Sequence, residues 1–141
     1  VEADVSSGDE LTMNGEKGKS KYKDKTVASQ INDASSELID LYEALKSICL
    51  GLGDDVQIKM LKLYIAFKRL KNFLTVEVKS GANFLLCYVK VNPDHVILEN
   101  GFTRDVRNIN HWGTGDLEII IRNHDDLNKA IPLLQSSYAA S

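Results

Sequence analysis

The stretch KLYIAFKRLKNFLTVEVKSGANFLLCYVKV, residues 62–91, decides the fold because hydrophobic residues recur in it at every second position. Alternation of this kind is typical of half-buried β-strands, in which successive side chains point to opposite faces. Polar turns at 69–72 and 80–82 separate three such runs, and the third, 84–91, is hydrophobic on both faces as in an interior strand. The stretch therefore predicts three antiparallel strands in a meander.

One helix is predicted before the meander in the sequence and another after it. Hydrophobic residues recur at three- and four-residue spacing between Asp33 and Leu50, and Gly51 is suited to end this helix. Downstream, residues 117–122 predict a fourth strand and residues 123–138 predict a final helix. Together these elements predict a two-layer α+β domain, with an antiparallel four- to five-stranded meander sheet and two main helices packed on one face.

Residues 1–31 differ from the rest because they are polar and hold few large hydrophobic side chains. Such a segment cannot bury enough surface to offset its chain entropy, so we predict a disordered, charged linker there and a single α+β domain over residues 32–141. The lysines that alternate between Lys17 and Lys25 leave a basic arm for nucleic acid as an alternative. The chain begins with valine, and we expect it to be the C-terminal part of a longer protein whose upstream domain is one of its partners.

The composition excludes several classes of protein. The 141 residues suffice for one domain, and no hydrophobic run reaches the length of a membrane span, so we expect no membrane partner. Cys49 and Cys87 are predicted to be buried thiols in a reducing compartment, which favours a cytoplasmic protein. His95, His111 and His124 lie far apart without metal-ligand spacing, so we predict neither a metal site nor another cofactor.

Charge is distributed unevenly along the chain, although the formal net charge is only −3. Residues 59–90 contain seven basic side chains and a single acidic one, Glu77. A local excess of this size attracts anionic partners. The competing interpretation is that these side chains are the solvated edges of a sheet.

The outward face of the meander is the candidate interface. Lysines alternate there with aromatic residues in a pattern suited to single-stranded DNA or RNA, because phosphates bind cations and bases stack on rings. The residues assigned to nucleic-acid binding are Lys62, Tyr64, Lys68, Arg69, Lys71, Phe73, Lys79, Arg104, Arg107 and His111. The alternative is that a partner protein, or another part of the protein, covers these aromatic side chains.

The segment FTRDVRNINHWGTGD, residues 102–116, contains the single tryptophan of the chain. We predict that Trp112 is a buried anchor fixed by a structural turn at Gly113, Gly115 and Asp116. The alternative is a ring that stacks on a base or another ligand.

The charged residues of the same segment allow three interpretations. The first is an intramolecular network of ion pairs, and the second is an anion site made by Arg104, Arg107 and His111. The third is an acid–base site that uses His111 with Asp105 or Asp116. We assign no catalytic residue.

Four motifs are more specific in combination than alone, namely LGDDV (52–56), KLYIAFK (62–68), RDV (104–106) and HWGTGD (111–116). Together they resemble the family called domain of unknown function 5655. The resemblance implies an accessory module of larger bacterial proteins, some labelled predicted transport proteins with a restriction-endonuclease-like domain upstream, others similar to phage-defence proteins. It implies no catalytic residues. Met60 and Leu61, where members often have Pro-Thr, depart from the family pattern.

Three functions remain open at this point. The first is a non-catalytic accessory domain of a nuclease-like or defence protein that binds nucleic acid through the basic and aromatic sheet face. The second is a module for protein–protein interaction or oligomerisation through the same face. The third is a small hydrolase or nuclease with His111 as its base.

Overall fold

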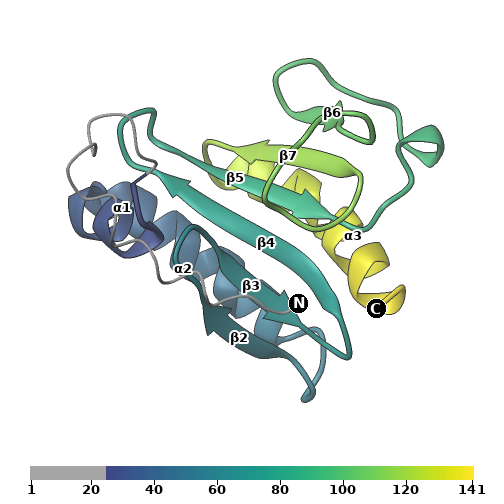
Figure 1. Ribbon diagram of the computed structural model, residues 1–141, viewed down its shortest axis with the longest axis horizontal. Helices are drawn as coiled ribbons and strands as arrows, with labels where there is room; N and C mark the ends of the chain where they lie inside the picture. Colours follow the sequence, from purple (N-terminus) through teal and green to yellow (C-terminus); the bar gives the residue numbers. More distant parts are fainter. Residues whose placement is uncertain (1–24) are drawn as a thin grey trace.

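A six-stranded antiparallel sheet forms the centre of the computed structural model, which describes residues 25–141 (Figure 1). The strands follow the order β2-β3-β4-β5-β7-β6 across the sheet, so that β2 to β5 form a meander. Their bounds are β2 Gln57–Met60, β3 Ile65–Lys68, β4 Asn72–Lys79, β5 Phe84–Val89, β6 Thr103–Asp105 and β7 Leu117–Ile121.

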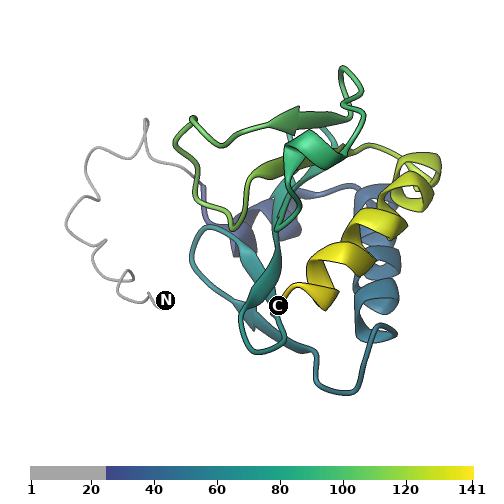
Figure 2. The same cartoon turned by 90° about the vertical axis from the view of Figure 1, so that its right-hand side faces the viewer.

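Two long helices, α2 (Ser36–Leu50) and α3 (His124–Ala139), lie side by side on one face of the sheet (Figure 2). A shorter helix, α1 (Val27–Asp33), packs against β4, and a 3-10 turn, η3 (Pro93–His95), follows β5. This arrangement confirms the predicted α+β class. No helix within residues 25–141 has both the length and the hydrophobicity that crossing a membrane requires.

The core lies between the sheet and the two long helices. Alternate residues of the strands point into it and meet one hydrophobic stripe of each helix. Its fully buried members include Leu45 of α2, Leu134 of α3, and Leu85, Cys87 and Ile119 of the central strands. Each large side chain buried in this way contributes about 1.5–3 kcal/mol to folding.

The sheet has six strands, whereas four to five were predicted. β2 and β6 are short edge strands of four and three residues. Residues 56–60 alternate between hydrophobic and polar side chains, with Val56 and Ile58 against the core, whereas β6 is too short to show a pattern. The expected strand at 62–68 begins only at Ile65, since Leu61–Tyr64 make the hairpin turn between β2 and β3 and the Leu61 N–H donates to the Tyr64 carbonyl at 2.9 Å. Lys62 and Tyr64 therefore lie in a turn and not on the strand.

The folded part begins earlier than the expected boundary at residue 32. α1 starts at Val27, which is buried, and the Thr26 side chain caps it by accepting a hydrogen bond from the Ser29 N–H at 3.1 Å. A second cap at Ser35 begins α2, three residues after the predicted start at Asp33, and α1 itself was not predicted. Residues 1–24, the remainder of the expected linker, lie outside the described part of the chain.

Candidate binding site on the open sheet face

The face of the sheet opposite α2 and α3 presents a row of paired residues that crosses all six strands. The row is Lys59, Ala66, Thr75, Tyr88, Glu118 and Arg104, from β2 to β6. Residues paired in this way share one side of a sheet. A second row beside it contains Glu77, Leu86 and Ile120. We call the surface made by these two rows, together with Lys68 and Lys79, the open face.

The loop between β6 and β7 folds back over part of the open face. The His111 ring stacks on Tyr88, with 4.4 Å between ring centroids and an interplanar angle of 10°. The Thr114 N–H donates to the Thr75 hydroxyl at 3.2 Å. Gly113 makes this contact possible, because a Cβ there would lie 2.1 Å from Tyr88 Cδ2. Gly115 has φ +78° and passes against the Val89 carbonyl.

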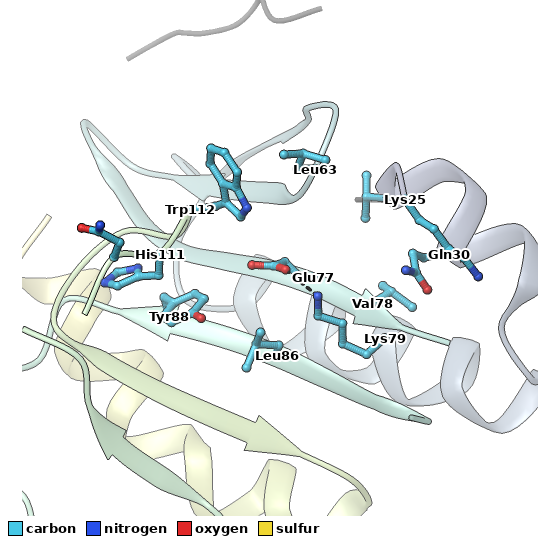
Figure 3. A pocket seen from close by; sticks show the side chains of 12 residues that line it. Lys25, Gln30, Leu63, Glu77, Val78, Lys79, Leu86, Tyr88, His111 and Trp112 are labelled. Carbon is cyan, nitrogen blue, oxygen red and sulfur yellow. Dashed lines mark ion pairs between the residues drawn. The ribbon is translucent and has the colours of Figure 1, made fainter. Parts of the chain in front are cut away.

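A pocket of about 330 Å³ opens between this loop, β4, β5 and α1 (Figure 3). Its aromatic walls are Tyr88, His111 and Trp112. The polar residues that line it are Lys25, Gln30, Glu77, Lys79 and Asn110, and the hydrophobic ones are Val27, Leu63, Val78 and Leu86. A pocket of this size with a few convergent polar groups is typical of a small-molecule or base site.

An ion pair lies at the centre of the pocket. Lys79 Nζ is 2.9 Å from Glu77 Oε1, and the two side chains are 37% and 11% exposed. Figure 3 shows the pair with Trp112, Tyr88 and Leu86 around it. A carboxylate that is nearly buried needs such a partner, because desolvation of an unpaired charge is costly.

Tyr88 is fixed by two residues that do not line the pocket, Glu118 and Arg104. Its hydroxyl donates to Glu118 Oε2 at 3.1 Å, and Arg104 binds the same carboxylate through Nε and Nη2 at 3.0 and 2.9 Å. Burial, and then the charges of Glu118 and Glu77, raise the pKa of Tyr88 well above its usual value. The phenol therefore stays protonated at neutral pH and serves as a rigid wall of the pocket.

The sequence model of the family described as "Domain of unknown function (DUF5655)" matches residues 27–141. The chain belongs to this family. An uncharacterised protein of Haemophilus influenzae is 27% identical to it over 110 residues, which are 78% of this chain and 36% of that protein. The chain thus spans about a third of the length of this relative, and no solved structure matches it.

The expected exposed aromatic row of this DUF5655 domain does not form. Phe73 is fully buried and packs edge-to-face on Phe67 and on Tyr138 of α3, at centroid distances of 6.5 and 5.4 Å. The cause is a β-bulge, since Phe67 pairs with Leu74 and Lys68 with Asn72, which leaves Phe73 unpaired. A bulge turns its extra residue out of the alternation. The assignment of Phe73 to nucleic-acid binding was wrong.

The predicted cations separate into two groups. Lys68 and Lys79 lie on the open face, where Lys68 pairs in register with Gln57. Arg69 instead lies beside α3: its Nε donates to Asp55 Oδ2 at 3.0 Å, and its guanidinium stands 4.5 Å from the Tyr138 ring centroid. Lys71 follows Arg69 in the turn between β3 and β4.

The arginines near Trp112 form an intramolecular network, the first of the three interpretations. Arg107 binds Asp94 through Nη1 and Nη2 at 3.1 and 3.0 Å, and its Nη2 is 2.7 Å from Asp105 Oδ2. Arg104 is bound to Glu118. Arg104, Arg107 and His111 therefore do not converge on a common anion site.

The third interpretation, an acid–base site, finds no support in the geometry. His111 Nδ1 is buried and has no hydrogen-bond partner among residues 25–141, so neither Asp105 nor Asp116 orients the ring. Asp116 is exposed, and its carbonyl accepts the Val106 N–H at 3.0 Å. Within residues 25–141, no group of three or more His, Cys, Asp or Glu side chains is placed to hold a metal ion.

Trp112 was predicted as a core anchor, and this prediction was wrong. Its side chain is 59% exposed and forms a wall of the pocket, which agrees with the alternative of a ring free to stack. The two glycines do hold the loop in place, as expected. Glu77 and Gln30 also line the pocket and were not predicted as site residues. The signal for Glu77 was present, because it is the only acid in a strand pattern that otherwise alternates hydrophobic residues with Thr and Lys.

Proposed function

We propose that this DUF5655 domain is a non-catalytic module that binds single-stranded nucleic acid on the open face, with one base in the pocket beside Trp112. The observation that carries the proposal is the exposed indole at the wall of a pocket that also contains the stacked Tyr88 and His111 rings. Exposed rings of this kind stack on bases of any sequence, and each stacked base contributes about 1–3 kcal/mol.

Charge on the two faces of the domain supports the same partner. The two long helices, on the face opposite the open face, carry five acidic and two basic residues. On the open face, Lys59 and Lys68 are exposed, and both acids, Glu77 and Glu118, are paired with a cation of the same face. A polyanion is therefore repelled by the helices and attracted to the open face.

The interface that we propose is smaller than the one expected from the sequence. Its cations are Lys25, Lys59 and Lys68, because Lys79, Arg104 and Arg107 are held by carboxylates. Single strands lose affinity with a log–log salt slope of about −0.7 per phosphate contact, so three contacts give a slope of about −2.

We further propose that the module belongs to a longer, cytoplasmic bacterial protein with a nuclease-like or defence-related upstream domain. The length of the Haemophilus influenzae relative supports a longer protein, and the family resemblance supplies the type of companion. The sequence of the full-length gene product tests this part, since an unrelated upstream domain would contradict it.

The binding proposal is tested by titrating the domain with a single-stranded oligonucleotide and following the fluorescence of its one tryptophan. We expect quenching of Trp112 on binding and a salt slope of about −2. Lys59→Ala with Lys68→Ala should weaken binding about tenfold or more and flatten the slope. Lys46→Ala, in α2 on the opposite face, is the matched control and should change neither.

Absence of quenching and of retention on an oligonucleotide column at low salt would refute nucleic-acid binding. Equal loss of binding in Lys46→Ala and in the open-face variant would refute the location. If the domain binds no nucleic acid but forms a dimer in light scattering, and replacement of Trp112 abolishes the dimer, the open face is a protein interface instead.

A further inference from the structure

Glu77 is unexpected on a surface that binds a polyanion. It is the only carboxylate among the described residues that line the pocket, and its side chain is 11% exposed. A carboxylate beside phosphates repels them, whereas one placed against the edge of a base accepts its N–H groups. The position of Glu77 is therefore suited to contact a base and not the backbone of a strand.

The Glu77–Lys79 pair offers three polar atoms in a fixed order. Lys79 Nζ donates, Glu77 Oε1 accepts while it also binds Nζ at 2.9 Å, and Glu77 Oε2 accepts. The order is thus donor, acceptor, acceptor. The ion pair holds this order, because Lys79 can contact a ligand without leaving Glu77.

Among the common bases, guanine alone presents the complementary order on its Watson–Crick edge. Its O6 accepts, and its N1–H and N2–H₂ donate side by side. Thymine and uracil have a second carbonyl where guanine has its amino group, so they place an oxygen against Glu77 Oε2. Cytosine and adenine place a ring-nitrogen lone pair against Oε1. Enzymes that extract a base read it in this way, by hydrogen bonds to its edge and by stacking on its faces.

We propose that the pocket is a guanine site, in which Lys79 binds O6, Glu77 binds N1–H and N2–H, and Trp112 stacks on the ring. This inference deepens the proposed function and rests on it for the strand that carries the base. The same chemistry fits a free guanosine nucleotide. Lys25, at the rim of the pocket, is available to a phosphate of either ligand.

The test uses oligothymidines of one length with a single central replacement, so that stacked guanine structures cannot form. The centre is guanine, inosine or thymine, and binding is read from Trp112 fluorescence. Inosine differs from guanosine only by the missing N2 amino group. We expect guanine to bind about 10- to 100-fold more tightly than thymine, with inosine between them, because one two-bond contact to a base gives discrimination of this size.

Glu77→Gln should reduce the preference for guanine over thymine by about tenfold or more, because its amide offers one acceptor oxygen in place of two. The comparison of guanine with inosine needs no variant, so it decides the matter even if Glu77→Gln does not fold. Equal affinity for all three strands overturns the guanine site and leaves the proposed function intact.

Guanosine monophosphate separates the two sources of the base. If the nucleotide binds and no strand binds, the guanine site is supported and the proposed binding of nucleic acid is refuted. If neither the nucleotide nor any strand binds, both are overturned.

Discussion

At the scale of single residues, Gly113 decides whether the pocket exists. A Cβ at this position would lie 2.1 Å from Tyr88 Cδ2 and 2.5 Å from the Thr75 hydroxyl oxygen, so alanine must push the loop off the sheet. We expect Gly113→Ala to lower the free energy of unfolding by about 1–3 kcal/mol, as overpacking commonly does. Urea denaturation of the variant and of the unmodified domain measures this difference in the free energy of unfolding. Gly81→Ala is the control, since nothing lies within 4 Å of a Cβ there, and coincident transitions for the two variants would contradict this role.

The residues of the site differ in how far the sequence predicts their roles, for a physical reason. The small size of Gly113 and the positive φ of Gly115 are backbone requirements, and glycine signals them directly. Trp112 gives no such signal, because a large aromatic side chain serves equally well in a core or at a binding surface. Which of the two applies depends on whether the loop lies over the sheet with its indole inward or outward, and the loop sequence alone does not state this.

At the scale of elements, Ser137 joins α3 to the bulged part of the sheet. Its hydroxyl donates to the Phe73 carbonyl at 2.5 Å and accepts the Lys90 N–H at 2.8 Å, and the residue is fully buried. Ser137→Ala leaves a buried carbonyl and a half-buried N–H without this partner. We expect a loss of about 1–3 kcal/mol in the free energy of unfolding, measured by denaturant titration.

Ser136→Ala is the matched control for this clamp, because Ser136 is its neighbour in α3 and is exposed. It should be neutral within about 0.5 kcal/mol. A neutral Ser137→Ala would show that water replaces the hydroxyl and that the bulge does not depend on α3.

Hydrophobic alternation in the sequence predicts some strands of the sheet and not others. Alternation located β4, β5 and β7 correctly, because each has one face in the core. It failed at Phe73, since a bulge arises from how two strands pair and not from either strand alone. β2 was not predicted although residues 56–60 alternate between hydrophobic and polar, and β6 is too short, at three residues, to show a period.

At the scale of the whole molecule, ion pairs connect segments that the sheet does not join. Arg107 bridges Asp94 of η3 and Asp105 of β6. Its hydrogen bonds and charge hold the pKa of both carboxyls below the usual value. Hydrogen bonds from Tyr138 and Arg69 do the same for the pKa of Asp55. These contacts lie at the surface, and they make the stability of the domain depend on pH.

The sign of this dependence follows from the lowered pKa values. A carboxyl whose pKa is lower in the folded than in the unfolded state stabilises the fold above its unfolded pKa, about 4, and this contribution is lost as the pH falls through the folded pKa. We therefore expect the free energy of unfolding to decrease as the pH drops below about 4.

Arg107→Met should flatten this decrease, because Asp94 and Asp105 then titrate closer to their unfolded values. Lys68→Met, which removes a cation that pairs with no carboxylate among residues 25–141, should leave its shape unchanged. Urea midpoints from pH 7 to pH 2 measure the effect, and parallel profiles for Arg107→Met and the unmodified domain would show that the Arg107 bridge does not govern acid stability.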